Sequence, residues 1–511
     1  MRDELGQRRL QVLDEGRDRA VERQHGLGKL TARERISRVV DPDSFYEFGV
    51  LVEAAEHARG AEVVAPADGV VTGIGDVDGR PVVLMSFDFT VFGGSNGVNG
   101  GLKVARACER SLQDRLPLVM LLDGGGHRIQ EGLDSCHFAH GYRGFQELVD
   151  LSGYVPVVAV MLGPGFAGPT NFAAFADYVV MVRGMSTMGI AGPALVRAAT
   201  GEDISKEDLG GADVQAELGV TDLAVDTEDE ALDSVRVFLG YLPSHADEPP
   251  PRDGEPVGPY DEVDIDGIVP SDSRKSYDVH EVIRALVDAD SEFEVKPTHA
   301  PNVVTSLVRL GGRPVGLIAN QPLHLGGALD SSACEKAAHF ISVCDSFGLP
   351  LLFLADVPGF LVGRSSTTTQ LARRSGRMLF ELGQATVPRF SVVLRKGYGA
   401  GYIAMCGGRS FDADLALAWP TAEICAMSVE GAVDVAYRRD FESAAEPAVR
   451  REELIRGFRE NVDPYLAARG FGVDDVIKPA ETRAVLLAAL RRAPARRQPR
   501  RPVKRHGISP I

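Results

Sequence analysis

The stretch VVTGIGDVDGRPVVLMSFDFTVFGGSNG, residues 70–97, returns later in the chain as VVTSLVRLGGRPVGLIANQPLHLGGALD, residues 303–330. Counted from Val70 to Val303, the offset is 233 residues, and it persists well beyond these two segments. It aligns the following pairs: Gly93-Gly94 with Gly326-Gly327, Lys103 with Lys336, Asp123 with Asp356, and Ala167-Gly168 with Ala400-Gly401. A fold written twice in one chain predicts two similar lobes, and a site at their junction would have two related halves.

Length and composition agree with two lobes. At 511 residues the chain is too long for a single hydrophobic core, and two domains of about 250 residues each fit it. A polar, proline-rich stretch at residues 244–259 has the composition of a linker, so we expect domains at residues 1–250 and 251–511. The formal net charge of −17 argues against nucleic acid as the main partner. We expect the basic tail, residues 495–511, to be solvated or packed on a neighbouring subunit.

The cysteines and the N-terminus indicate a protein of the cytoplasm. Six dispersed cysteines form no CxxC pair, so neither a zinc knuckle nor a disulfide framework is expected. The first 26 residues carry both charge signs and no apolar core, which is typical of neither a signal peptide nor a transit peptide. No run approaches 18 consecutive apolar residues, so no membrane span is expected.

Strand-like and helix-like runs alternate in both halves. The first half has strands predicted at 81–87, 117–123, 155–163 and 176–182, with a helix at 98–116; the second has strands at 314–320, 350–356 and 389–396, with a helix at 331–348. This alternation predicts βα units in an α/β fold with a mainly parallel sheet. The strands are continuously apolar, which indicates burial on both faces of the sheet.

Each half also has a strand that runs into a glycine-rich turn and then a helix-like segment. A turn of this kind presents free backbone N–H groups and the positive end of a helix dipole. It can therefore hold an anion, or the oxyanion that forms during acyl chemistry. The candidate catalytic donors are the amides of Ala167, Gly168, Ala400 and Gly401. Close helix–sheet packing would explain one such turn, but two in register favour a functional role.

A second glycine element in each half, Gly93-Gly94 and Gly326-Gly327, could supply further amides or could form tight turns. The loop DGGGHRIQEG places His127 just beyond a strand end, and strand-end Asp123 and Asp356 are expected to cap turns. No GxSxG elbow, HExxH, Walker A sequence or catalytic triad is recognisable.

Longer motifs follow one another in a fixed order along nearly the whole chain. They are GKLTARERI, DGVVTG, DFTVFGGS, RIQEG, EDLGGA, NQP, KAAHF, DVPGF, RKGYGAGY and WPTAEI. Together, over residues 28–508, they resemble the carboxyltransferase β subunit of biotin-dependent acyl-CoA carboxylases, of the propionyl-CoA and acetyl-CoA carboxylase type.

The resemblance implies two tandem crotonase-like ββα-spiral domains and a ring-like homo-hexamer, a trimer of dimers with active sites at the dimer interface. The N-terminal domain would bind the acyl-CoA, and the C-terminal domain of another subunit would bind carboxybiotin. The amides of Ala167-Gly168 would then stabilise the enolate of the thioester, and those of Ala400-Gly401 the ureido oxyanion of biotin. Carboxybiotin would release CO2, the biotin anion would take the α-proton, and the enolate would attack CO2 without a side-chain base.

The same resemblance names substrate-binding candidates and partners. The candidates are Gly93, Gly94, Gly125, Gly126, His127, Phe166, Gly326, Gly327, Tyr402 and Ile403. No Met flanks any Lys, so the chain has no biotinyl-lysine motif, and a separate biotin carboxylase/biotin carrier α subunit must supply carboxybiotin. Coenzyme A enters as part of the substrate, and no metal is expected.

The chain departs from the family pattern in the glycine turns. His127 stands where the family has a small residue, Phe166 adds bulk, Ala167 replaces a glycine, and Pro169 removes an amide donor. Ile403 stands where propionyl-type members often have Asp, which would favour a longer or more apolar acyl group. Three hypotheses stay open: a carboxyltransferase for a less common acyl-CoA, a biotin-independent decarboxylase or carboxyl transferase on malonyl-type thioesters or an unusual acceptor, and a non-catalytic partner subunit.

Overall fold

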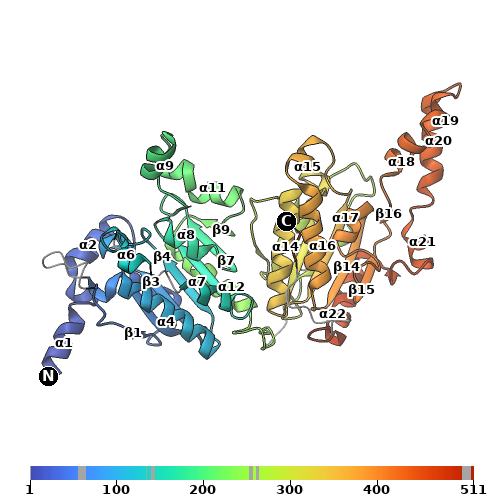
Figure 1. The fold of residues 1–511 in the computed structure, drawn as a ribbon. Coiled ribbons are helices and arrows are strands. Elements are labelled where there is room, and N and C mark those ends of the chain that lie inside the picture. The colour runs from blue at the N-terminus through green and yellow to red at the C-terminus, as the bar shows by residue number, and fades with distance from the viewer. Residues whose placement is uncertain are drawn as a thin grey trace. The chain divides into compact units, whose positions relative to one another are not determined.

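The computed structural model describes residues 2–55, 65–133, 135–139, 144–252, 257–260, 264–497 and 508–510. The chain divides into two compact units, residues 1–248 (unit 1) and 249–511 (unit 2). Figure 1 shows a twisted sheet flanked by helices in each unit. The α/β class and the duplication predicted from the sequence are confirmed by these two sheets.

Unit 1 is built on a seven-stranded sheet in the order β1-β2-β3-β4-β5-β7-β9. The strands of this unit are β1 (Tyr46–Phe48), β2 (Val70–Val77), β3 (Arg80–Phe87), β4 (Leu118–Leu122), β5 (Val157–Met161), β6 (Pro164–Phe166), β7 (Tyr178–Val182), β8 (Thr187–Gly189) and β9 (Leu223–Val225). The first three pair antiparallel and the rest pair parallel, while β6 and β8 form a small sheet of their own. The strands β4, β5 and β7 are buried along their whole length, as their unbroken apolar sequences predict.

Unit 2 repeats this order in an eight-stranded sheet, β10-β11-β12-β13-β14-β15-β17, with β16 paired to β14. Its strands are β10 (Phe293–Glu294), β11 (Val303–Leu310), β12 (Arg313–Asn320), β13 (Leu351–Val357), β14 (Arg389–Tyr398), β15 (Leu415–Ala418), β16 (Glu423–Cys425) and β17 (Asp475–Val476). The hairpin β2–β3 and the hairpin β11–β12 have the same length and register, 233 residues apart. The repeated sequence therefore encodes a repeated sheet.

Helices cover both faces of each sheet. Unit 1 has α1 (Arg2–Leu10), α2 (Asp18–Gly26), α3 (Ala32–Val39), α4 (Val98–Asp114), α5 (Ile129–Gly132), α6 (Ser135–Phe138), α7 (Gly144–Leu151), α8 (Gly168–Ala173), α9 (Pro193–Thr200), α10 (Lys206–Gly210), α11 (Ala212–Glu217) and α12 (Glu228–Tyr241). Unit 2 has α13 (Val279–Leu286), α14 (Ser331–Ser346), α15 (Arg364–Thr368), α16 (Leu371–Gln384), α17 (Gly399–Ala404), α18 (Val429–Ala436), α19 (Arg438–Glu442), α20 (Pro447–Arg459), α21 (Pro464–Arg469) and α22 (Thr482–Arg492). Figure 1 shows α4 beside α7 in unit 1, and α14 beside α16 in the equivalent place of unit 2.

A buried lysine ties the first long helix of each unit to the start of the hairpin. The ammonium of Lys103 on α4 donates to the carbonyls of Ala67 and Val70, and that of Lys336 on α14 donates to those of His299 and Val303. Burial lowers the pKa of both lysines to about 8. Because the same contact appears in both units, we assign it to the architecture that the repeat encodes.

Strand-end Asp123 anchors the N-terminal segment of unit 1. Its carboxylate accepts from the ammonium of Lys29 at 2.5 Å and from the guanidinium of Arg35 at 2.7 Å, all fully or nearly buried. Arg35 also donates to Glu228 at 2.7 Å. The expectation that Asp123 caps a turn is wrong: it pairs with two cations from GKLTARERI and holds that motif against the end of β4. Asp356 likewise pairs with Arg395 at 2.9 Å, although it also accepts from the backbone N–H of Lys396.

Asp177 joins the ends of β5 and β7 and has an unusual ionisation. Its Oδ2 accepts from the N–H of Val157 at 2.8 Å, and its own N–H donates back to the carbonyl of Val157. Burial raises the pKa of Asp177 to about 7, and the nearby carboxylate of Asp222 acts in the same direction. In unit 2, Asp414 exchanges the same two hydrogen bonds with the backbone of Arg389, and its carboxylate is bound by Arg497 at 2.5 Å.

We predict that Asp177→Asn removes a pH-dependent loss of stability. Below about pH 4 the carboxyl is protonated in both the folded and the unfolded chain; as the pH rises toward 7 the unfolded chain releases the proton first, so the folded state loses stability. The asparagine oxygen can still accept from Val157. Urea unfolding near pH 5 and near pH 8 should therefore show a greater free-energy gain for the variant at the higher pH. An equal gain at both pH values would contradict the raised pKa.

The basic tail returns to its own unit. Arg496 donates to the carbonyls of Asp345 and Ser346, and Arg497 pairs with Asp414. The expectation of a solvated tail is therefore wrong for residues 496–497: the guanidinium of Arg496 binds carbonyls at the end of α14, and that of Arg497 binds the carboxylate of Asp414. The alternative of an arm on a neighbouring subunit stays a prediction. Residues 498–507 of that tail lie outside the described part of the chain.

Candidate functional site

The first candidate turn, in unit 1, joins β6 to α8. Phe166 ends β6, and a methyl group added at Gly189 of β8 would lie 3.0 Å from its ring, so the ring packs over that glycine. Gly168 begins α8, and the first N–H groups of a helix have no acceptor within it, so the N–H of Gly168 makes no helical hydrogen bond. Pro169 follows in the first turn, where a missing N–H costs no helical hydrogen bond.

Ala167 differs from the sequence prediction. Its N–H donates to the carbonyl of Gly189 at 2.8 Å, so this amide is engaged within the small β6–β8 sheet and is not free to bind a ligand. Its backbone has φ 66° and ψ −111°, a region that glycine adopts readily and alanine does not. The turn therefore keeps the shape of a glycine turn at the cost of backbone strain.

Relief of this strain gives a testable expectation. We predict that Ala167→Gly stabilises unit 1 by about 1 kcal/mol, because the strain of about 1–3 kcal/mol exceeds the added flexibility of the unfolded glycine. The apparent Tm should rise by about 2–4 °C. Gly201→Ala is the control, because Gly201 has φ 78° and a methyl group there would meet no other atom, so backbone strain alone should lower the Tm. A fall in Tm for Ala167→Gly would show that the turn is not strained.

The loop after β4 lies against this turn and supplies a second amide. A methyl group added at Gly126 would lie 3.2 Å from the nitrogen of Gly168 and 3.1 Å from the Cβ of Ala167. Among the described residues, neither the N–H of Gly126 nor that of Gly168 donates to another protein group. The free donors that the structure brings together are thus Gly126 and Gly168. Gly125 lies beside them in open space, with its N–H donated to Gly93 at 3.1 Å.

A buried ionic network holds the loop in place. Arg128 donates to Asp68 at 2.7 Å and to Glu131 at 2.8 Å, and Glu131 in turn accepts from the N–H of Val98 at the start of α4. The guanidinium of Arg128 also stacks on the ring of Phe92, 4.4 Å from its centre. The motifs DGVVTG and RIQEG therefore contribute loop rigidity, which sequence analysis did not anticipate for Asp68 or Arg128.

His127 is half-buried, and its ring turns toward α5 and α6. A methyl group at Gly132 would lie 2.8 Å from its Cδ2, and its ring meets Phe138 edge-on with centres 5.7 Å apart. None of the described residues hydrogen-bonds its buried Nε2. No contact places the ring on the amides of Gly126 and Gly168.

Unit 2 repeats the paired glycines. α17 begins at Gly399, so the N–H groups of Ala400 and Gly401 belong to its first turn and lack helical acceptors. A methyl group added at Gly401 would lie 2.8 Å from the Cα of Gly359. Gly359, at φ 127°, occupies the position that the repeat aligns with Gly126, and its carbonyl accepts from Leu329 as that of Gly126 accepts from Asn96.

Sequence analysis missed Gly359 and Phe360. The repeat offset, applied to Gly126 and His127, leads directly to these two residues of the motif DVPGF. Isolated bridges pair Asn96 with His127 and Leu329 with Phe360 in the same way.

The remaining glycine candidates act chiefly in packing. A methyl group at Gly94 would lie 2.0 Å from the carbonyl oxygen of Asp123, and one at Gly327 would lie 2.6 Å from that of Asp356. Gly93 and Gly326 precede them at φ 63° and 61°. These pairs allow the turn to pass close to the next strand, so tight turning explains them without a ligand.

Gly93 also borders a small pocket of about 330 Å³. Its other lining residues include Arg23 and Gln24 of α2 and the rings of Phe89 and Phe92. A guanidinium beside two aromatic rings can bind a phosphate and a planar base.

Tyr402 and Ile403 follow Gly401 on α17, and both are half-buried. The ring of Tyr402 packs on Gly397 and Gly407, where added methyl groups would lie 3.0 Å and 2.1 Å away, and burial raises the pKa of its phenol to about 12. Tyr402 therefore fills the interior of unit 2.

Within the described part of the chain, no group of three or more His, Cys, Asp or Glu side chains is arranged to hold a metal ion. None of the described helices is long and apolar enough to span a membrane. The five described cysteine side chains are free thiols; that of Cys136 lies outside the described part.

Comparisons with known proteins cover the whole chain. Residues 23–508 match the family model of the carboxyl transferase domain. The carboxyltransferase subunit of propionyl-CoA carboxylase from Haloferax mediterranei is 41% identical, over 100% of this chain and 99% of that one. The α subunit of methylmalonyl-CoA decarboxylase from Veillonella parvula is 38% identical, over 97% and 96%. A solved structure of transcarboxylase 12S, a hexamer with methylmalonyl-CoA and methylmalonic acid bound, is 40% identical with a TM-score of 0.93, over 100% and 98%.

Proposed function

Because this chain belongs to the carboxyl transferase family, it is a carboxyltransferase subunit, and we propose that it moves a carboxyl group between carboxybiotin on a partner subunit and the α-carbon of an acyl-CoA thioester. The same membership bears out the crotonase-like fold that the sequence led us to expect for each domain. What supports the chemistry most directly is the pair of backbone amides, Gly126 with Gly168, which approach so closely that a methyl group at Gly126 would lie 3.2 Å from the nitrogen of Gly168.

We assign the acyl-CoA to unit 1. The amides of Gly126 and Gly168 replace the originally expected pair Ala167-Gly168 as donors to the enolate oxygen, since that of Ala167 is engaged. Preorganised amides stabilise charge that develops on a thioester oxygen, and removal of one such donor typically costs a factor of about 10²–10³ in rate. The pocket lined by Arg23, Phe89 and Phe92 suits the nucleotide end of coenzyme A.

We assign carboxybiotin to unit 2. Gly359 and Gly401 pack closely at the start of α17, as Gly126 and Gly168 do in unit 1, and this parallel supports a second oxyanion site there for the ureido oxygen of biotin. There Gly401 and Ala400 would donate to that oxygen and orient the ring. Bound carboxybiotin supplies CO2 and a basic nitrogen, so the chain itself needs to supply only binding and charge stabilisation.

The assembly and partners follow from the relatives. We propose a homo-hexamer like that of transcarboxylase 12S, and a separate α subunit that carries and carboxylates biotin, in the cytoplasm. For the substrate we propose propionyl-CoA or a more apolar acyl-CoA, with Ile403 of another subunit near the acyl group at the proposed dimer interface.

A second candidate is decarboxylation of a malonyl-type thioester, favoured by the similarity to the methylmalonyl-CoA decarboxylase subunit. The same amide pair would stabilise the enolate left when CO2 departs. Carboxyl transfer and decarboxylation would therefore use the same enolate site in unit 1. They differ in whether the carboxyl group is exchanged with carboxybiotin or leaves as free CO2.

One assay separates them. The purified chain is mixed with biotinylated carrier, biotin carboxylase, ATP and labelled bicarbonate, together with acyl-CoAs from acetyl to branched medium-chain. Label fixed into one acyl-CoA supports the carboxyltransferase and names its substrate. Loss of CO2 from methylmalonyl-CoA without carrier, together with no fixation, would support the second candidate. If the chain showed no activity in either test, the hypothesis of a non-catalytic subunit would be supported.

A further inference from the structure

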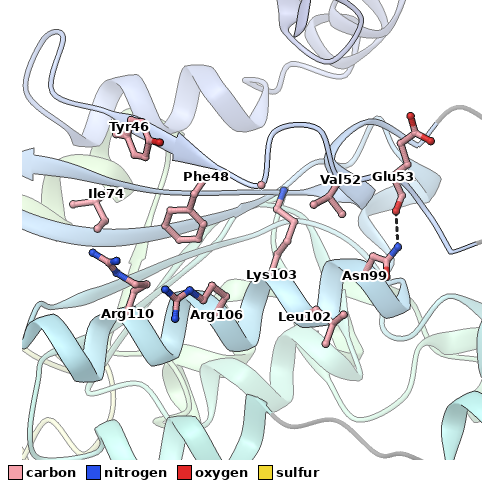
Figure 2. A pocket seen from close by; sticks show the side chains of 11 residues that line it. Tyr46, Phe48, Val52, Glu53, Ile74, Asn99, Leu102, Lys103, Arg106 and Arg110 are labelled. Atoms are coloured by element: carbon pink, nitrogen blue, oxygen red, sulfur yellow. Dashed lines mark hydrogen bonds between the residues drawn. The ribbon is translucent and has the colours of Figure 1, made fainter. Parts of the chain in front are cut away.

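A groove of about 680 Å³ runs along α4 of unit 1, away from the paired glycines. Its walls are the strands β1 and β2 on one side and α4 on the other, with the segment after β1 at one end. Figure 2 shows the side chains of Arg106 and Arg110 rising from α4 toward Phe48 and Ile74. A cavity of several hundred Å³ is within the range that holds small organic ligands.

The strand side of the groove is apolar. Phe48 and Ile74 lie half-buried on neighbouring strands, and Val52 and Leu102 extend the surface toward the start of α4. Tyr46 is 73% exposed at the rim. A ligand with a hydrocarbon or aromatic body would bury this surface.

The helix side is cationic and incompletely bonded. Arg106 and Arg110 each pair with one carboxylate of their own helix, Glu109 at 3.3 Å and Asp114 at 2.5 Å, and exposed pairs of this kind are weak. The Nε of Arg110 is buried, and no described residue accepts its hydrogen.

The repeat shows that the fold does not require this chemistry. At the equivalent places on α14, His339 stands for Arg106, Val343 for Arg110 and Glu335 for Leu102. Glu335 is bound by Arg377 of α16, which covers it. Of the groove residues on α4, only the architectural lysine is kept in unit 2, so the two arginines are particular to unit 1. The apolar wall recurs in part, since Leu307 aligns with Ile74 and pairs with Phe293.

We propose that this groove is a second binding site, separate from the paired glycines, for an organic anion with an apolar body and a carboxylate head, of the fatty-acid type. The head would accept from the guanidinium groups of Arg106 and Arg110, and the chain would lie on Phe48 and Ile74. The proposal is independent of the reaction assigned above.

Tyr46→Trp supplies a local probe, because the chain has a single other tryptophan, Trp419, which is buried in unit 2. The full-length variant is titrated with decanoate and, as a neutral match, decanol. We expect saturable fluorescence change with decanoate and at least tenfold weaker binding of decanol, since one charge-assisted hydrogen bond contributes about 1.5–3 kcal/mol. Equal binding of the two, or no saturation, would overturn the proposal.

Arg106→Gln with Arg110→Gln, in the same background, tests the residues. Decanoate binding should weaken at least tenfold and decanol binding should stay, with an unchanged Tm because both arginines are surface ion-pair partners. Arg38→Gln, which breaks another exposed pair on unit 1, should leave decanoate binding intact. Unchanged decanoate affinity in the double variant would overturn the assignment. A loss of decanoate binding in Gly126→Ala would also overturn it, because the groove is proposed to be separate from the paired glycines.

Discussion

Replacement of Gly126 by alanine is expected to lower the rate of carboxyl transfer by about 10²–10³-fold, while the chain stays folded. The added methyl group would lie 3.2 Å from the nitrogen of Gly168 and 3.1 Å from the Cβ of Ala167. It would therefore stand between the two amides, where the thioester oxygen is proposed to bind. The effect should appear in kcat with the acyl-CoA, measured by transfer of labelled carboxyl.

The neighbouring Gly125 is a matched control. A methyl group there meets no atom within 4 Å, and the residue has no positive φ, so Gly125→Ala should keep activity within about twofold of the unsubstituted chain. If Gly126→Ala were as active as Gly125→Ala, the enolate would not bind at this amide pair. A large fall in Tm for Gly126→Ala alone would assign the loss to packing.

Arg35→Met is expected to destabilise unit 1 by about 3–5 kcal/mol. The guanidinium is fully buried between Asp123 and Glu228, at 2.7 Å from each, and its removal leaves Glu228 buried without that cation. Lys29 would still neutralise Asp123, so the loss should come mainly from Glu228. Urea unfolding followed by circular dichroism gives the change in free energy.

Arg38→Met, one turn further along α3, is the control. Arg38 pairs with Asp229 at 2.9 Å, but both side chains are more than half exposed, so the expected loss is below about 1 kcal/mol. The buried ion pairs of Asp123, Lys29, Arg35 and Glu228 form the Asp123 cluster. If Arg35→Met lowered the free energy of unfolding as little as Arg38→Met, this cluster would not be the anchor of the N-terminal segment.

The sequence predicted the sheets well because the apolar strand pattern is local and occurs in both halves of the internal repeat. Unbroken apolar runs such as 118–122 and 351–355 needed only burial on both faces to become central strands, and their positions follow the offset. The sequence also placed both glycine-rich turns correctly between a strand and a short helix, whereas their role as sites stays a prediction. Which amide in the turn is free depends on Gly189, a carbonyl 22 residues beyond Ala167, and no local pattern reveals that contact.

The ion pairs were beyond sequence analysis for the same reason. Asp123 and Asp356 occupy equivalent strand ends, yet their cations come from different places, Arg35 on an N-terminal helix and Arg395 on a strand. The repeat predicted the equivalence of the carboxylates but carried no information on their partners. His127 drew attention as a departure from the family pattern, whereas the structure turns its ring toward Phe138.

The Asp123 cluster also has a consequence for synthesis of the chain on the ribosome. Arg35 and its partner Glu228 are 193 residues apart, so a nascent chain exposes a cation near its beginning long before the carboxylate that completes the cluster has been made. Long-range contacts of this kind slow folding, and domains of a long chain generally fold as units. Unit 1 should therefore reach protease resistance only after residue 228 has emerged from the ribosome.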